Sequence, residues 1–418
     1  MATSVELKPV TANSLDEVLS PLSSEEFLRR YWGQSFVHVP GRPGKFSHLL
    51  PWSHLNDILA HHRLRQGRLR LFQDTKEVPA SSYLDTRDGR EPRLKAPEMT
   101  SLLAEGATLI VDEMDDLEPA VRELAVGLER IFRIRIQINM YAGWRTNNGF
   151  DLHFDDHDTM ILQVFGRKRW QIFNPTRLHP FKKDSEEAAK PTEPPIWEGV
   201  FEEGGLFYIP RGWWHIAFPM DEPCLHLTVG FSNPTGVSLV HWLGDQIKSS
   251  TVGRRDLPHI ANSDEQAAYL RELLSAVQDA WKPDLIERYM KSLDGRALPR
   301  TEVQLPYAAT PEGLQLENSS RIKLTTPRRL DLSGTPKDGY LAFKCFGKSW
   351  QCPEVALPAL YVLNDGQVHT VGDLLSFTTN TSTAFVTQGF LSALVMDGVA
   401  NKLDLSNGRP EGQMGDPT

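Results

Sequence analysis

Short strand-like segments follow one another through the middle of this chain, and they constrain its fold more than any other feature. Residues 133–144 (RIRIQINMYAGW) place Ile134, Ile136 and Ile138 at every second position between charged or polar neighbours, as in a strand with one buried face. Similar segments recur as TMILQVF, KRWQIF, GGLFYIP, HIAFPM and CLHLTVGF, separated by turn residues. This spacing predicts an all-β sandwich or barrel that begins near Ile134.

Helical and strand-like segments precede this region and predict mixed α/β packing around it. Ser23 and Glu26 form a capping box, with Leu22 and Phe27 placed as a hydrophobic staple, so a short helix should run over residues 24–32. Three further elements are expected, namely a helix over 53–62, a strand over 68–72 and, after Pro119, a helix over 120–131. Residues 182–199 interrupt the strands with a polar, proline-rich stretch that we expect to be a surface loop.

The pattern changes after Pro234. A second capping box from Ser263 to Gln266 opens a helical stretch, and another helix follows Pro283, so the two resemble a helical hairpin that packs on itself or on a second subunit. Residues 298–311 read as a linker to a third unit, whose three helices and strand pair are compatible with a winged helix. The last residues, from 406 to 418, are expected to form a mobile tail.

Composition narrows the classes of protein that remain. The 45 basic and 54 acidic residues give a net charge of −9, which argues against general phosphate-driven nucleic-acid binding and suits a basic protein partner. The three cysteines, Cys224, Cys345 and Cys352, are too few for a disulfide framework or a four-cysteine zinc site. No apolar run resembles a signal peptide or a transmembrane helix, so a soluble, cytoplasmic protein is expected.

One motif in the strand-rich region carries candidate metal ligands. In residues 149–159 (GFDLHFDDHDT), His153, Asp155 and His157 should point to one face if the segment is extended. Two imidazoles and one carboxylate on one face of an iron(II) ion leave three positions for a bidentate 2-oxo acid and dioxygen. We expect His215, in YIPRGWWHIAF, to supply the third ligand beside His153 and Asp155. The alternative uses Asp155 and His157, with His153 outside the metal's ligand set.

Three further residues are candidates for holding a 2-oxo acid co-substrate. Lys168, in VFGRKRWQIF, could neutralise its far carboxylate, in which case Arg167 and Arg169 must point the other way. A lysine between two arginines is more commonly solvated surface charge. Thr228 could donate a hydroxyl hydrogen bond, and His226 lines the same pocket or is an ordinary core histidine.

These segments together resemble the JmjC-type hydroxylases of the ribosomal oxygenase branch, cupin-like proteins that hydroxylate ribosomal proteins. The resemblance lies in FLRRYWGQSFVHVPG, NNGFDLHFDDHDTMILQVFGRKRWQIFNP, YIPRGWWHIA and CLHLTVGF, and the layout agrees over most of the chain. It implies that His153, Asp155 and His215 bind Fe(II) and that Lys168 binds 2-oxoglutarate. Asp151, Leu152, Trp213 and Trp214 depart from the pattern that relatives often show, which leaves the substrate undecided.

The resemblance also implies an architecture. The fold class is α+β, with a double-stranded β-helix (jelly-roll, JmjC/cupin) barrel in a catalytic domain at 1–240. A helical dimerisation region at 241–300 and a winged-helix-like domain at 301–405 follow, with the tail at 406–418. A homodimer is implied by the same resemblance.

The leading hypothesis is therefore an Fe(II)- and 2-oxoglutarate-dependent dioxygenase that hydroxylates a protein side chain, with a ribosomal protein as the first candidate. A second hypothesis keeps the chemistry but has a precursor peptide or small metabolite as substrate, and demethylation of a methylated peptide is a further variant. The contrasting hypothesis is a non-catalytic cupin-like binding module, which the basic residues of the third unit (Arg321, Lys323, Arg328 and Arg329) keep open.

Overall fold

The structure is a computed structural model that describes residues 14–86, 91–146, 149–184, 189–303, 305 and 314–403. Its contacts divide the chain into two compact units, Met1–Asn233 and Pro234–Thr418, and each is treated by itself below. The predicted tail at 406–418 and half of the predicted linker at 298–311 lie outside the described residues.

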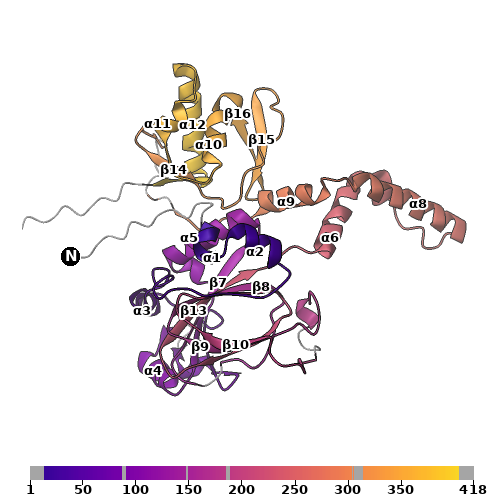
Figure 1. The fold of residues 1–418 in the computed structure, drawn as a ribbon. Coiled ribbons are helices and arrows are strands. Elements are labelled where there is room, and N and C mark those ends of the chain that lie inside the picture. Colours follow the sequence, from indigo (N-terminus) through magenta and orange to yellow (C-terminus); the bar gives the residue numbers. More distant parts are fainter. Residues whose placement is uncertain are drawn as a thin grey trace, which may run out of the picture. The chain divides into compact units, whose positions relative to one another are not determined.

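The first unit is organised by two antiparallel sheets (Figure 1). The larger sheet has the strand order β1-β11-β8-β13-β7-β6-β2-β3, and the smaller one has the order β10-β9-β12. The strands are β1 (Val37–Val39), β2 (Leu69–Gln73), β3 (Lys76–Glu77), β6 (Thr108–Val111), β7 (Ile136–Gly143), β8 (Asp158–Phe165), β9 (Lys168–Phe173), β10 (Trp197–Phe201), β11 (Leu206–Ile209), β12 (Trp214–Pro219) and β13 (Cys224–Phe231). A separate hairpin joins β4 (Leu84–Asp85) to β5 (Arg93–Leu94).

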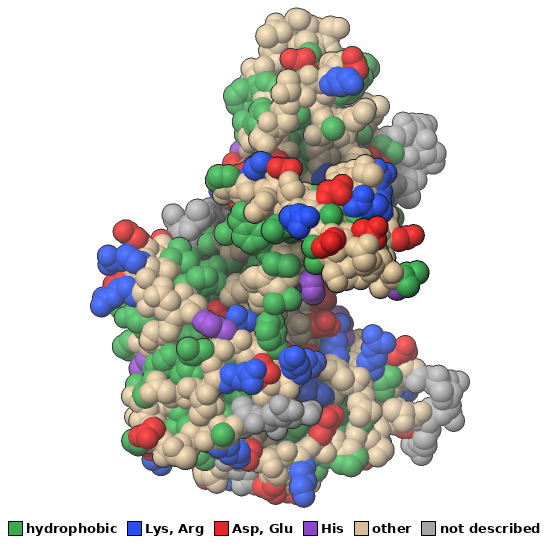
Figure 2. All heavy atoms as spheres, turned by 90° about the vertical axis from the view of Figure 1, so that its right-hand side faces the viewer, with side chains coloured by type: hydrophobic (Ala, Val, Ile, Leu, Met, Phe, Trp, Pro, Cys, Tyr) green, Lys and Arg blue, Asp and Glu red, His purple; other side chains and the backbone are tan. Residues whose placement is uncertain are grey.

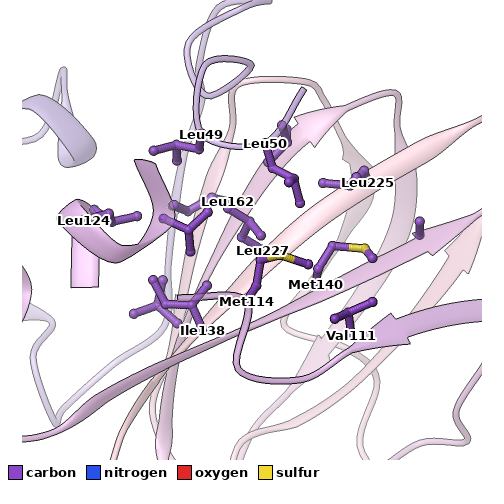
Figure 3. Packing of buried hydrophobic residues seen from close by; sticks show 14 of the residues in the cluster. Leu49, Leu50, Val111, Met114, Leu124, Ile138, Met140, Leu162, Leu225 and Leu227 are labelled. Carbon is purple, nitrogen blue, oxygen red and sulfur yellow. The ribbon is translucent and has the colours of Figure 1, made fainter. Parts of the chain in front are cut away.

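Helices cover one face of the larger sheet, because alternate residues of its strands are apolar on that side. Ile138, Met140, Leu162, Leu225 and Leu227 meet side chains from the helical segments there, including Leu124 (Figure 3). Each of these leucines contributes about 1.5–3 kcal/mol by leaving water. The helices of this unit are α1 (Ser14–Leu19), α2 (Ser24–Arg30), α3 (Trp52–His61), α4 (Ala96–Ala104) and α5 (Pro119–Phe132).

The other face of the larger sheet packs against the smaller sheet. Ile161 and Phe207 from the larger sheet meet Trp170, Ile172 and Phe201 from the smaller one in a second, largely aromatic core. Polar residues on the same strand faces, Thr159 and Gln163 on β8 and Lys168 on β9, turn into the same interior. The strand-rich region is therefore a barrel-like pair of sheets, and the interior where their facing side chains meet is called the chamber below.

The second unit has a helical part and a mixed part. The helical part comprises α6 (Gly236–Gln246), α7 (Thr251–Arg254), α8 (Ser263–Ala280) and α9 (Leu285–Arg296). The mixed part comprises β14 (Arg321–Leu324), β15 (Tyr340–Cys345), β16 (Lys348–Pro353), α10 (Leu357–Leu363), β17 (His369–Thr370), α11 (Val371–Leu375), α12 (Thr381–Met396) and β18 (Ala400–Leu403). A three-stranded sheet, β17-β14-β18, and the β15–β16 hairpin surround a core of its own, which includes Leu324, Phe343, Leu360 and Leu391.

Several expected elements differ from those found. The cap of α8 is Asn262, not Ser263, because the Asn262 side chain accepts hydrogen bonds from the N–H groups of Asp264 and Glu265. The strands β6 and β10 were not predicted from the sequence. Both are short, and neither has the alternation of a one-sided strand: β6 is buried throughout, and β10 adjoins the proline-rich loop.

Candidate functional site

The two predicted histidine ligands lie on neighbouring backbone segments at one end of the chamber. His153 and His215 form an isolated antiparallel bridge, in which the N–H of His215 donates to the carbonyl of His153 at 2.8 Å and the reverse bond measures 3.2 Å. The N–H of Gly212 donates to the carbonyl of Asp155 at 3.0 Å. These bonds join the turn before β12 to the segment from His153 to Asp155, so that His153 and His215, 62 positions apart in sequence, lie side by side.

The side chains of His153, Asp155 and His215 converge. Each offers one ligand atom, and these atoms all lie within 4.8 Å of one another. The Nε2 atom of His215 is 3.7 Å from Oδ2 of Asp155, and the two imidazole centroids are 4.4 Å apart. Two imidazole nitrogens and a carboxylate at this separation fit one divalent transition metal, and this donor set is the one typical of non-haem iron(II).

Backbone carbonyls fix the tautomer of both histidines. Nδ1 of His153 lies 2.7 Å from the carbonyl of Asp151, and Nδ1 of His215 lies 3.1 Å from that of Trp213. A carbonyl only accepts, so each Nδ1 carries the hydrogen and each Nε2 keeps its lone pair for a metal. Burial, with a smaller effect of the neighbouring His153, lowers the pKa of His215 to about 4. His215 is therefore neutral at neutral pH, as a ligand must be.

The expectation that His153, Asp155 and His157 share one face of a strand was wrong. Only His153 of this segment makes a bridge, residues 156 and 157 are bent, and β8 begins at Asp158. The period-two rule fails because the chain turns before it enters the sheet. Nδ1 of His157 is 3.0 Å from Oδ1 of Asp156, and His157 lies outside the three-residue cluster.

Lys168 lies inside the chamber. It is 4% exposed, whereas its neighbours point outward, Arg167 to Glu222 and Arg169 to Glu198. The structure therefore has the arrangement of one buried and two exposed cations that a strand requires. Burial lowers the pKa of Lys168, and among the described residues no carboxylate pairs with its ammonium group. A buried cation without a protein counter-ion is costly, which points to an anionic ligand.

His226 and Thr228 face the same interior from β13. His226 is opposite Tyr141 on β7 and Gln163 on β8, and its ring stacks on Tyr141 with centroids 5.0 Å apart. Thr228, two positions after His226 on the same face of β13, is half-buried. Burial, then the charges of Lys168 and His215, hold the pKa of His226 well below its usual value, so this imidazole is neutral beside the lysine.

Sequence reasoning missed other polar residues of the chamber. Trp170, Thr159 and Gln163 each bury a side-chain nitrogen or oxygen that has no hydrogen-bond partner among the residues the structure describes, as does His226 at Nδ1. Trp170 was foreseeable, because it lies two positions after Lys168 on the same strand face. Thr159 and Gln163 were not, since only the strand order brings β8 to this chamber. Unsatisfied buried polar atoms gathered in one place are typical of a ligand site.

A buried carboxylate holds the turn that carries His215. Asp158, at the start of β8, accepts hydrogen bonds from the Tyr208 hydroxyl at 2.7 Å, the N–H of Arg211 at 2.9 Å and the Asn233 amide at 3.1 Å. Burial and the Asp158 charge raise the pKa of Tyr208, whose oxygen also accepts from the N–H of Gly33 at 2.7 Å. Asp158 therefore ties the segment that leads into β12 to β8 and β11.

We expect the substitution Asp158→Asn to weaken metal binding without touching a metal ligand. It replaces one acceptor oxygen with an NH₂ group, so one of the three donors loses its partner, at a cost of about 1–3 kcal/mol. The looser turn should reduce Mn(II) affinity about 10-fold, measured by calorimetry, together with a lower melting temperature. Asp156→Asn, the same change at the half-exposed neighbour, should alter neither. Unchanged Mn(II) affinity in a destabilised Asp158→Asn protein would show that Asp158 supports the fold alone.

Comparison with known proteins finds a family model that matches part of the chain, and relatives that match more of it. Residues 119–239 match the JmjC domain. The chain is 24% identical over 346 residues to a Drosophila persimilis protein named bifunctional lysine-specific demethylase and histidyl-hydroxylase NO66, and 25% identical over 288 residues to the protein of that name from Aedes aegypti. These alignments cover 78% and 62% of this chain. It spans 48% and 43% of the length of those relatives.

Solved structures agree on the fold. The ribosomal oxygenase YcfD from Escherichia coli superposes with a TM-score of 0.57 at 17% identity, over 92% of this chain and 99% of that one. Another structure of YcfD, in complex with cobalt and 2-oxoglutarate, gives a TM-score of 0.53 at 18% identity, again over 92% and 99% of the two chains. The expected JmjC/cupin fold with mixed helices and antiparallel sheets is therefore confirmed.

Proposed function

We propose that this chain, whose residues 119–239 match the JmjC domain and which has the fold of the ribosomal oxygenase YcfD, is an Fe(II)- and 2-oxoglutarate-dependent dioxygenase that hydroxylates a protein side chain. The observation that carries the proposal is the pairing of two features in one chamber. His153, Asp155 and His215 form a three-donor cluster, and Lys168 is buried with no carboxylate paired to it in the described part of the chain. A metal ion would complete the three-donor cluster, and a dianionic co-substrate would neutralise the charge of Lys168.

In this mechanism the residues of the chain bind the metal and orient the co-substrate. His153, Asp155 and His215 would hold the metal, and Lys168 would pair with the far carboxylate of 2-oxoglutarate. The aromatic core around Trp170 and Phe207 excludes water from the co-substrate. When bound there, iron(II) supplies the oxidising chemistry, in which 2-oxoglutarate and dioxygen become succinate and carbon dioxide as a C–H bond is hydroxylated.

The substrate we propose is a side chain of a ribosomal protein. YcfD is named a ribosomal oxygenase, and the NO66 proteins are named histidyl-hydroxylases, so both names point to protein targets. The net charge of −9 suits a basic client of this kind. A cytoplasmic location is part of the proposal because ribosomes would have to be reached. Among the described residues, no helix has the length and apolar character needed to cross a bilayer.

The test is mass spectrometry of ribosomal proteins from cells with and without the gene. We expect one ribosomal protein to gain 16 Da, the mass of one oxygen atom, in the wild type alone, and purified enzyme with Fe(II) and 2-oxoglutarate to restore it on ribosomes from the deletion strain. Enzyme carrying Asp155→Asn should not restore it. Unmodified ribosomal proteins in both strains, with oxidation of a separate precursor peptide or metabolite, would favour the second hypothesis.

Demethylation is a separate candidate because the NO66 name includes a lysine-specific demethylase. It would use the same metal site but release formaldehyde from a methylated lysine. Offering methylated peptides and assaying formaldehyde separates it from hydroxylation.

The contrasting proposal is a binding module without turnover. The face drawn in Figure 2 carries acidic and basic side chains interspersed, not one continuous basic surface. Arg328, one of the basic residues that kept this option open, is buried and paired with Asp294 at 3.1 Å. A complete absence of 2-oxoglutarate turnover in the metal-loaded wild-type protein would favour this alternative.

We further propose that the helical region at 241–300 forms a homodimer and that residues 301–405 form a winged-helix-like domain. On α8, Tyr269 is the one buried residue, while Leu270 and Leu274 are 61% and 55% exposed, so α8 leaves apolar surface uncovered. The second unit supports the other proposal with α10, α11, α12 and the β15–β16 hairpin around one core. The catalytic domain at 1–240 completes the proposed organisation.

A further inference from the structure

Trp170 buries its indole N–H among the aromatic side chains between the two sheets. Its Nε1 atom is buried and has no hydrogen-bond partner within the described part of the chain. An indole N–H only donates, so no choice of tautomer or rotation removes the problem. Leaving such a buried donor without an acceptor is destabilising. A tryptophan needed only for packing could have been a phenylalanine, as Phe201 and Phe207 are in the same core.

The strand register fixes where Trp170 lies relative to the two ends of the site. On β9 the inward residues are Lys168, Trp170 and Ile172, and Ile172 is paired with His215 on β12. Four residues of strand, about 13 Å, therefore separate the backbone of Lys168 from the position opposite the metal ligand. Trp170 occupies the midpoint, and its ring centroid is 6.0 Å from that of His215 and 5.9 Å from that of His226.

A molecule that extends from the metal to Lys168 must pass Trp170. Its far carboxylate has two oxygens and about four acceptor positions, more than one ammonium group can fill. The metal-bound end has its oxygens engaged by the metal. The far carboxylate, beside Lys168, therefore has acceptor positions without donors. Trp170 is the next inward residue after Lys168 on β9, and its indole N–H can donate a hydrogen bond.

We propose that the Trp170 indole N–H donates a hydrogen bond to the far carboxylate of 2-oxoglutarate, alongside Lys168. This inference rests on the proposed function, because it takes 2-oxoglutarate as the co-substrate. Trp170 is then a binding residue that recognises the second carboxylate. It helps the site to bind a dicarboxylic 2-oxo acid in preference to a monocarboxylic one.

Calorimetry on the full-length protein loaded with redox-inert Mn(II) provides the first test. Hydrogen bonds to charged groups contribute about 1.5–3 kcal/mol, so Trp170→Phe should weaken 2-oxoglutarate binding at least 10-fold. The affinity for 2-oxopentanoate, which has no far carboxylate, should be the same in Trp170→Phe and wild type. Mn(II) affinity should also be unchanged. Trp197→Phe makes the same change in the same aromatic core and should bind both ligands as wild type does.

A second measurement needs no variant. In protein labelled with ¹⁵N at the tryptophan indoles, the Trp170 signal can be assigned through its proximity to Phe207, whose ring centroid is 5.6 Å away. It should move downfield on addition of 2-oxoglutarate to the Mn(II)-free or Zn(II)-loaded protein and stay in place with 2-oxopentanoate. A packing role alone would not produce this difference.

The outcomes separate the two ideas. If metal-loaded wild-type protein binds no 2-oxoglutarate, the proposed function fails. If the wild type binds it but Trp170→Phe binds it equally well, or the indole signal does not respond, the role of Trp170 is refuted while the proposed function stands. If Trp170→Phe does not fold, the indole signal of the wild type decides alone.

Discussion

Replacing Asp155 by asparagine is expected to abolish 2-oxoglutarate turnover. The change keeps the size and shape of the side chain but removes the one negative charge of the metal-binding cluster. Neutral amide oxygens bind iron(II) far more weakly than carboxylates do. The loss should exceed the roughly 10- to 100-fold effects typical of residues that only orient ligands. Mn(II) affinity by calorimetry and succinate formation with Fe(II) would measure the two consequences.

The adjacent residue provides a matched control. Asp156→Asn makes the same change one position away, on a side chain that contacts His157 and lies outside the cluster. It should retain metal affinity and turnover. His157→Ala tests the alternative ligand pair, Asp155 with His157. If His157→Ala lost its metal while His153→Ala kept it, the assignment of His153 would be wrong.

Replacing Lys168 by methionine is expected to affect binding and stability in opposite directions. The substitution preserves length and removes the charge that we propose to pair with the co-substrate, so 2-oxoglutarate affinity should fall by about 100-fold or more. The free protein should unfold at the same or higher temperature, because the Lys168 ammonium is buried and has no carboxylate partner among the described residues, which is destabilising. Calorimetric titration with 2-oxoglutarate and thermal unfolding of the ligand-free protein check both halves.

The same lysine predicts a dependence on pH. Burial lowers the pKa of Lys168 in the free protein, and binding of a dianion requires the charged form. Affinity for 2-oxoglutarate should therefore fall as the pH rises through that lowered pKa, and Lys168→Arg should remove the dependence because arginine stays protonated. Arg169→Met, which removes an exposed cation paired with Glu198, should leave affinity and its pH profile unchanged. A loss in Arg169→Met equal to that in Lys168→Met would mean that general surface charge, not the buried ammonium, attracts the ligand.

Much of the barrel was predictable because its strands carry their own signal. KRWQIF and CLHLTVGF coincide with β9 and β13, and the buried position of Lys168 follows from alternation between Arg167 and Arg169. The helix that follows Pro119 was also expected, since α5 begins at that proline. Local geometry sufficed in these places because a period of two or 3.6 depends only on the chain itself.

Prediction failed where the outcome depended on distant segments. The segment at His153 looked like a strand but bends at residues 156 and 157, because Asp158 must enter β8 while His153 pairs with His215. The N-cap of α8 is Asn262 and not Ser263. This difference of one residue depends on backbone dihedral angles and not on residue type.

The amino-acid sequence by itself determined the strands, the exposed and buried faces and the presence of two histidines, one carboxylate and one lysine that could serve a metal and an anion. Only the tertiary structure decided that His215 lies beside His153 and that His157 does not join them. It also decided that Trp170, Thr159 and Gln163 bury polar atoms with no hydrogen-bond partner among the residues that the structure describes. The physical reason is that side-chain periodicity is local, whereas strand order and register are fixed by the packing of the whole sheet.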